Sequence, residues 1–242
     1  MKKHEFAMML SLSAVLGLIA CGSDDSNPAS DGGVSGSTMV DSRDGQSYRI
    51  VKIGKQTWMA QNLNYAAPNS VCYNDDPNFC TEYGRLYFAG EVSTACPSGW
   101  HVPKKEEWMK LLCFVSGEKY CPGGLLDNYQ DEMGNEKFKS KEGWAQLALP
   151  DRVIDCNGTD DYNFTVLPAG QYYSSTVGFW GMGGSAYFWG YEKYGKTEGD
   201  VSHHIVTFPH MNISSGYGSS LVSINFITPP VLSANSIRCV KD

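Results

Sequence analysis

The sequence predicts an α+β fold with few helices, long loops and small antiparallel sheets, and three features support this. Gly contributes 26 and Pro 11 of the 242 residues, which favours turns and short strands over long helices. One segment, Pro103 to Val115, carries apolar residues at helical spacing. Apolar residues make up 42% and charged residues only 19%, as in a globular domain with a sizeable core.

The expected elements are a hairpin, a helix and a series of short strands. Alternating side chains after the Asp44–Gly45 turn signal predict a β-hairpin over 46–63. Pro103 and the acidic residues that follow it are typical of a helix start. Later strands are expected near 164–168, 186–190, 204–208, 219–226 and 236–241, with the N- and C-terminal strands meeting.

The first residues are typical of a secretory signal. Lys2 and Lys3 precede an apolar run that ends in Leu18-Ile19-Ala20-Cys21, which resembles the bacterial lipobox. That resemblance implies a signal peptide over 1–20, cleavage before Cys21, and acyl chains such as palmitate on the Cys21 anchor. The alternative is an ordinary signal peptide with a chance cysteine. Residues 21–38 then form a lipidated, flexible tether rich in Gly, Ser and Asp, and 39–242 form the domain.

Charge and the residues after Cys21 indicate where the protein acts. The net charge of −7 argues against a nucleic-acid partner, and no internal segment is apolar enough to span a bilayer. Gly22 follows the anchor where an inner-membrane retention signal has Asp, which favours the outer membrane. Asp24–Asp25 resembles acidic signals that export lipoproteins to the cell surface.

The remaining seven cysteines are interpreted as disulfide partners, because an exported chain keeps disulfides. Cys72 with Cys80 and Cys113 with Cys121 each enclose a short segment that favours a local bridge. Cys96 and Cys239 are candidates to tie the middle of the chain to its end. Cys156 is then either free and buried, or a sign that the pairing differs; the spacing fits no structural zinc site.

Six ordered phrases resemble the Fibrobacter succinogenes major paralogous domain over residues 39–242. They occupy 53–63, 84–87, 96–103 with Glu107–Trp108, 167–170, 186–189 and 236–240. The Gly99–Pro103 phrase and the Arg238–Val240 ending also resemble the formylglycine-generating-enzyme superfamily, which has a C-type-lectin-like fold. This resemblance implies that 103–115 is the first helix and that Cys239 lies on the last strand, consistent with a Cys96–Cys239 bridge.

An enzyme is not the preferred interpretation. The oxidase-like relatives use a pair of reactive cysteines near the C-terminus, and only Cys239 is present there. The histidines of the domain do not give the cluster that an iron site needs, because His203 and His204 would point to opposite faces of a strand. His101 is interpreted as a packed, hydrogen-bonded imidazole. The alternative is a degenerate oxidoreductase that uses His101, His203 or Cys156.

A binding module is preferred, with sugar rings stacking on exposed aromatic side chains. Trp180, Tyr191 and Tyr194 are the candidate ligand-binding residues, because Gly or charged residues flank them. The segment Tyr187–Trp189 is expected in the core instead. The predicted function is therefore a non-catalytic outer-membrane lipoprotein that binds polysaccharide or an envelope protein. A purely structural surface protein is the other alternative.

Calcium is the one ion that the sequence suggests, although no cofactor is required. Asp155, Asn157, Asp160 and Asp161 place oxygen ligands at near-alternate positions, as flexible calcium loops do. The same residues are also typical of ordinary turns.

Overall fold

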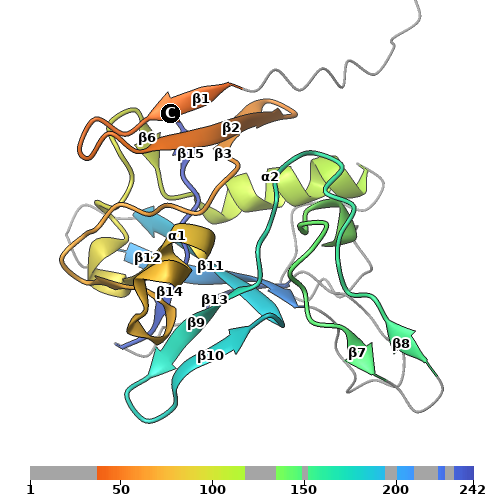
Figure 1. The fold of residues 1–242 in the computed structure, drawn as a ribbon. Helices are drawn as coiled ribbons and strands as arrows, with labels where there is room; N and C mark the ends of the chain where they lie inside the picture. Colours follow the sequence, from red (N-terminus) through yellow and green to blue (C-terminus); the bar gives the residue numbers. More distant parts are fainter. Residues whose placement is uncertain (1–36, 118–134, 149–151, 194–200, 210–222, 227–231) are drawn as a thin grey trace, which may run out of the picture. The chain divides into compact units, whose positions relative to one another are not determined.

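The computed structural model describes residues 37–117, 135–148, 152–193, 201–209, 223–226 and 232–242 (Figure 1). The predicted signal peptide, Cys21 and nearly all of the tether lie outside these ranges, as do Cys121, Tyr194 and His210. Within the described part, no helix combines the length and apolar character needed to cross a membrane.

The first sheet joins the two ends of the domain (Figure 1). Its strand order is β1 (Thr38–Val40), β2 (Ser47–Ile53), β3 (Gln56–Met59), β15 (Val240–Lys241) and β6 (Trp100–His101). Antiparallel pairing of Ile53 with Gln56 in β2 and β3 confirms the predicted hairpin. Val240 pairs with Trp58 of β3, so the expected meeting of N- and C-terminal strands is also confirmed.

The second sheet is larger than predicted, with eight described strands. Its order is β13 (Ser223–Phe226), β12 (Val201–Pro209), β11 (Ser185–Lys193), β9 (Ala169–Ser174), β14 (Ala234–Asn235), β5 (Leu86–Phe88) and β4 (Ser70–Val71), with β10 (Gly178–Met182) paired to β9. Ala186 of β11 pairs in parallel with Gly170 of β9. The described sheet is therefore mixed rather than small and purely antiparallel.

One of the expected strands is wrong, one is too long, and a third lies partly outside the described residues. Residues 164–168 form no strand in the described structure, because Thr165 has a φ of 54° that breaks the extended backbone. Of 236–241, only β15 is a strand, since the backbone of Ser236 bonds to Trp189 and that of Ile237 to Leu63. Within the expected strand 219–226, the described residues form β13, and residues 219–222 lie outside the described ranges.

One helix was predicted, and the described residues contain two α-helices. The helix α2 (Lys105–Ser116) confirms the prediction, and the Glu107 carboxylate accepts a hydrogen bond from the Lys104 N–H at its start. The missed helix α1 (Pro77–Tyr83) begins with Pro77 and is capped by Asp76, which accepts from the Asn78 N–H. The short elements are η1 (Tyr73–Asp75), η2 (Ala89–Glu91), η4 (Asn135–Lys137) and the paired strands β7 (Leu147–Ala148) and β8 (Val153–Ile154).

The buried side chains form two cores. In the first, Trp108 of α2 packs against Trp58 with ring centroids 4.8 Å apart, and Phe188 of β11 contacts the same Trp108 ring. The second core contains Tyr87, Trp189 and Ile237. Phe188 and Trp189 are fully buried, which confirms their predicted core role, whereas Tyr187 is only half-buried.

Disulfides hold the domain at two described places. Cys72 bonds to Cys80, and Cys96 bonds to Cys239 across 143 residues of sequence, as the sequence analysis favoured. The longer bridge stabilises the fold by about 5 kcal/mol in the chain-entropy model. Cys113 is also disulfide-bonded, and its predicted partner Cys121 lies outside the described residues. Cys156 is free and buried, one of the two possibilities left open.

Candidate functional site

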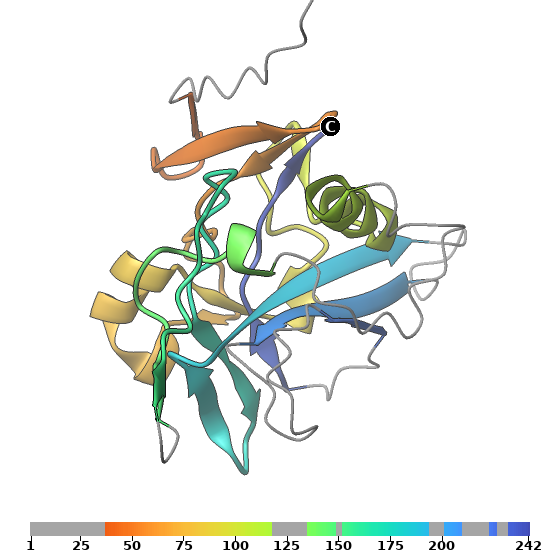
Figure 2. The ribbon, with the colours of Figure 1, turned by 90° about the vertical axis from the view of Figure 1, so that its right-hand side faces the viewer.

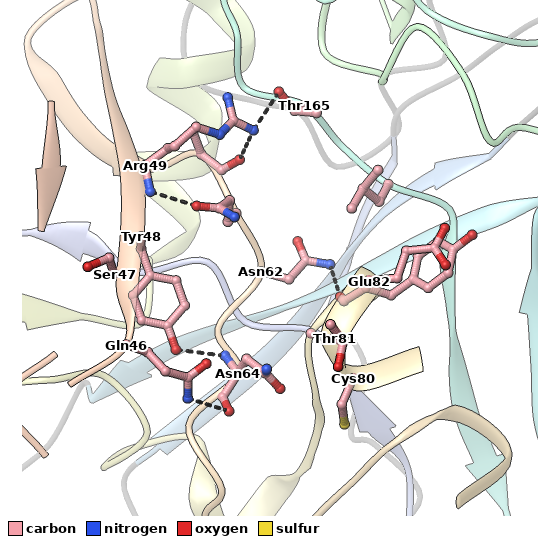
Figure 3. Close-up of a pocket in the computed structure, with 15 residues that line it drawn as sticks. Gln46, Ser47, Tyr48, Arg49, Asn62, Asn64, Cys80, Thr81, Glu82 and Thr165 are labelled. Carbon is pink, nitrogen blue, oxygen red and sulfur yellow. Dashed lines mark hydrogen bonds between the residues drawn. The ribbon is translucent and has the colours of Figure 1, made fainter. Parts of the chain in front are cut away.

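A polar pocket of about 160 Å³ opens beside the β2–β3 hairpin (Figure 3). Four segments form its walls: the start of β2, the residues after β3, the end of α1 and the loop before β9. The polar lining residues are Gln46, Ser47, Tyr48, Arg49, Gln61, Asn62, Asn64, Thr81, Glu82, Tyr83 and Thr165. The volume equals that of about five water molecules, so the pocket suits one small ligand unit.

Tyr48 lines the pocket on the side of the β2–β3 hairpin and holds the loop at Asn64 in place. Its ring is buried, and its hydroxyl oxygen accepts a hydrogen bond of 3.0 Å from the Asn64 N–H (Figure 3). Burial raises the pKa of Tyr48 to about 12, so the phenol stays neutral at physiological pH. The Gln46 side chain donates to the Asn64 carbonyl at 3.1 Å, which holds the same loop from its other side.

Asn62 joins the pocket to the helix α1. Its amide nitrogen donates to the Tyr83 carbonyl at 2.8 Å, at the last residue of the helix. Gly84 follows with a φ of 77°, and a Cβ on it would lie 2.7 Å from the Asn62 Cβ. Only glycine therefore allows the chain to turn this closely past Asn62.

The buried side chain of Arg238 lies behind the pocket lining and supports it through Asn62. Arg238 is fully buried, and its guanidinium donates to the Asn62 side-chain oxygen at 2.9 Å and to the carbonyls of Phe164 and Thr165. The rings of Phe164 and Phe188 lie 4.6 and 5.5 Å from its guanidinium carbon. Burial lowers the pKa of Arg238 to about 9, so it remains a cation at neutral pH.

The loop before β9 is held in a conformation that side chains rarely adopt. Asp160, Asn163 and Thr165 all have positive φ, between 49° and 54°. The Asp160 carboxylate accepts from both the N–H and the hydroxyl of Thr165, each at 2.7 Å, which keeps the loop in place. Backbone strain of this kind accumulates at binding sites, where the surrounding structure maintains it.

Other polar groups of the pocket remain available to a ligand. The Arg49 guanidinium makes only long contacts, to the Ala60 carbonyl at 3.3 Å and to the Thr165 hydroxyl at 3.4 Å, and no described carboxylate forms an ion pair with it. Glu82 brings the opposite charge from α1, and Asn64 brings a side-chain amide, whereas the Gln61 side-chain oxygen already accepts a hydrogen bond of 2.7 Å from the Arg49 N–H. The pocket lining therefore contains both donors and acceptors, which suits ligand hydroxyl groups.

The family model of the Fibrobacter succinogenes major domain matches residues 51–241. The chain belongs to this family. The match begins in β2 and ends in β15, so it includes strands of both sheets. Comparison with curated proteins finds no match, and comparison with solved structures finds none either.

Phrases of the family that lie far apart in sequence meet at this pocket. Gln61 and Asn62 come from the first phrase, Gly84 begins the second, and Leu167 begins the fourth. Arg238, from the last phrase, bonds to Asn62 behind the lining. The pocket is therefore built by the segments that define the domain.

The predicted aromatic ligand residues have different surroundings. Trp180 on β10 is 54% exposed, and its ring centroid lies 6.2 Å from that of Tyr187. Tyr191 on β11 is half-buried against the second core. Tyr194 lies outside the described residues. Trp180 is thus the one of the three whose described ring is largely open to a ligand.

Three of the four proposed calcium ligands accept hydrogen bonds from the chain itself. Asp155 accepts from the Asn157 N–H at 3.0 Å, the Asn157 side-chain oxygen accepts from the Trp144 N–H at 3.0 Å, and Asp160 holds Thr165. Asp161 is exposed. Across the described residues, no group of three or more His, Cys, Asp or Glu side chains is arranged to hold a metal ion. The oxygens of Asp155, Asn157 and Asp160 thus make hydrogen bonds typical of turns, and calcium binding by this loop stays a prediction.

The histidines and the free thiol also have identifiable surroundings. His101 lies between two carboxylates, with Nδ1 2.6 Å from Asp242 and Nε2 2.9 Å from Glu107, so it is the hydrogen-bonded imidazole expected. His203 and His204 are adjacent on β12, opposite Tyr191 and Gly190 of β11. The Cys156 thiol contacts the Ile154 carbonyl at 3.7 Å in a buried position.

Sequence reasoning missed Arg49, Gln61 and Glu82. Each is an ordinary polar residue, and they come from separate elements that only the tertiary fold brings together. Gln61 lies within a quoted family phrase, which was the available signal.

Proposed function

We propose that this protein is an outer-membrane lipoprotein with a non-catalytic, C-type-lectin-like domain that binds polysaccharide. The pocket carries the proposal: amides, Arg49 and Glu82 offer donors and acceptors to ligand hydroxyls within about 160 Å³, the space of a single sugar ring. The lipobox-like start and the tether support presentation at the cell surface. The exposed Trp180 ring supports a sugar ligand independently, since sugar C–H groups stack on aromatic faces.

The test is retention of the full chain, in detergent, on a panel of immobilised polysaccharides. Arg49→Ala is expected to reduce retention at least several-fold without changing the melting temperature, because Arg49 is exposed. Arg152→Ala is the matched control, since Arg152 is also exposed and does not line the pocket. Running the panel with calcium and with a chelator tests the calcium loop at the same time.

Each outcome discriminates between functions. Retention that Arg49→Ala abolishes supports the pocket, and retention lost only with chelator supports the calcium loop instead. If no polysaccharide is retained, the lectin function is wrong and an envelope protein or a structural role is favoured. A bound transition metal or a reactive Cys156 thiol in the purified chain would favour the oxidoreductase alternative.

A further inference from the structure

The charged residues of the pocket lie on different walls. Among the described lining residues, Arg49 of β2 and Glu82 of α1 are the two that carry a charge. Figure 3 shows them on different sides, with Arg49 beside Thr165 and Glu82 on the side of α1. No described ion pair joins them, so the pocket keeps a separate cationic wall and a separate anionic wall.

The Arg49 guanidinium has neutral and distant partners. Its contacts with the Ala60 carbonyl at 3.3 Å and the Thr165 hydroxyl at 3.4 Å both use Nη2. Both are longer than the roughly 2.8 Å of a hydrogen bond between a guanidinium and a carboxylate. Among the described residues, Nε and Nη1 have no hydrogen-bond partner. The guanidinium is therefore able to offer a ligand carboxylate two parallel donors without losing a strong contact.

A second cation lies behind this wall of the pocket. Arg238 is fully buried and forms no ion pair with a described carboxylate. Burial lowers the pKa of Arg238, the charge of Asp160 acts in the opposite direction, and the charge of Arg49 lowers the pKa further. The two guanidinium groups therefore repel each other, with Asp160 as the one carboxylate that acts on Arg238. An anion bound to Arg49 would reduce this repulsion.

The cationic wall is held in place before a ligand binds. The Arg49 N–H donates to the Gln61 side-chain oxygen at 2.7 Å, and Asp160 accepts two hydrogen bonds of 2.7 Å from Thr165. Figures 1 and 2 show residues 160–168 running from the side of the β2–β3 hairpin to β9 and β10. Donors that are positioned in advance lose little conformational entropy when a ligand arrives.

Glu82 determines which part of a ligand faces α1. Burial and a hydrogen bond with the Glu82 carboxylate raise the pKa of the neighbouring Tyr83, so the Tyr83 hydroxyl is a neutral partner of this carboxylate. A carboxylate has further acceptor positions, which suit the hydroxyl donors of a sugar. It repels a second carboxylate, however. A ligand that carries one acid group is therefore oriented with that group toward Arg49 and its hydroxyls toward Glu82.

We propose that the pocket selects an acidic sugar, a uronic acid unit whose carboxylate pairs with Arg49 while its hydroxyls face Glu82. The inference rests on the proposed polysaccharide-binding function of the pocket. A uronic acid carries one carboxylate and several hydroxyls on a single ring, which matches two opposite charges on separate walls within about 160 Å³. The net charge of −7 repels polyanions in general, so retention of an acidic polysaccharide requires a local cationic site such as this one.

The test compares ligands that differ only in charge. The full chain in detergent is titrated calorimetrically with oligomers of galacturonic, glucuronic and mannuronic acid, each as the free acid and as the methyl ester. For at least one of these sugars, the acid is expected to bind on the order of tenfold more tightly than its ester at low salt. This preference should shrink as added salt screens the charges. Arg49→Gln should abolish it, and Arg49→Lys should recover only part of it, because an ammonium lacks the planar fork of donors.

Arg152→Gln is the matched control, because Arg152 is an exposed arginine that does not line the pocket, so this variant should keep the full preference for the acid. Equal affinity for acid and ester, or a preference that both Gln variants reduce equally, would overturn the selection of an acidic sugar. Failure to bind any of the acids would also overturn it. Retention of a neutral polysaccharide on the panel, lost with Arg49→Ala, would then leave the proposed function of the pocket intact.

Discussion

Lys139 is a buried cation whose burial destabilises the fold at neutral pH. Its side chain is 2% exposed, and its ammonium lies 4.2 Å from the Trp144 ring centroid. Burial lowers its pKa from 10.5 to about 8, although Cys156, Glu136 and Asp155 act in the opposite direction. A difference of that size corresponds to roughly 3 kcal/mol against the folded state below pH 8.

The sign of the pH dependence follows from proton binding. Between pH 8 and 10.5 the unfolded chain keeps the Lys139 proton while the folded chain loses it, so this residue makes stability rise with pH in that window. Lys139→Met removes the charge and keeps an unbranched apolar side chain. Losing the contact with the Trp144 ring removes about 0.5–2 kcal/mol of this stabilisation, so the free energy of unfolding of the variant should be higher by about 1–2 kcal/mol at pH 7. The gain should shrink toward pH 9.5.

Urea unfolding followed by circular dichroism, at pH 7 and 9.5 with disulfides intact, measures this difference. Lys141→Met is the control, because Lys141 is exposed two residues away and should change the free energy of unfolding by less than about 0.5 kcal/mol. Comparing each variant with the parent chain at the same pH cancels the contribution of Tyr48, which titrates at higher pH. A Lys139→Met variant that is less stable at pH 7, or whose gain is the same at both pH values, would refute the reasoning.

Three further predictions concern stability. Arg238→Met should lower the free energy of unfolding in urea by roughly 3–5 kcal/mol, because it leaves buried acceptors unpaired. Arg238→Lys should recover little of this loss, and a Met variant as stable as the parent chain would contradict the prediction. Gly84→Ala should lower the free energy of unfolding by about 1–3 kcal/mol more than Gly45→Ala. Gly45 has a similar φ, but a Cβ added to it would have no neighbour within 4 Å, so equal losses in urea unfolding would show that φ alone matters. Replacing Cys96 and Cys239 by Ser should cost about 2–5 kcal/mol in thermal unfolding, and an unchanged melting temperature would argue against the bridge.

Local sequence signals predicted the elements that depend on local periodicity. The helix α2 was found because Trp108 and Leu112 recur at helical spacing, and the β2–β3 hairpin was found from alternation and Gly54. The strand expected at 164–168 failed because Asp160 binds Thr165 and holds it at positive φ. That contact depends on loop geometry, which strand propensity does not describe.

The candidate site could not be predicted from local sequence signals, for a different reason. The Asp and Asn pattern after Asp155 fits calcium ligands and turn residues equally well, and only the fold shows that Asp155 and Asp160 also accept backbone hydrogen bonds. Arg49 and Glu82 line the same pocket, although they are 33 positions apart in the sequence and lie on different elements. Lys139 likewise becomes unusual only because the fold buries it under Trp144.

Residues around the pocket fall into two groups with different expected effects. Asn62 and Arg238 bond to each other and to the backbone, so changing either one alters the walls and the stability together. The exposed Arg49 side chain forms the second group, because its guanidinium makes only long contacts, so changing it alters what the pocket binds while the fold persists. Loss of binding with unchanged stability is therefore informative only for the second group, and the binding tests rest on it for that reason.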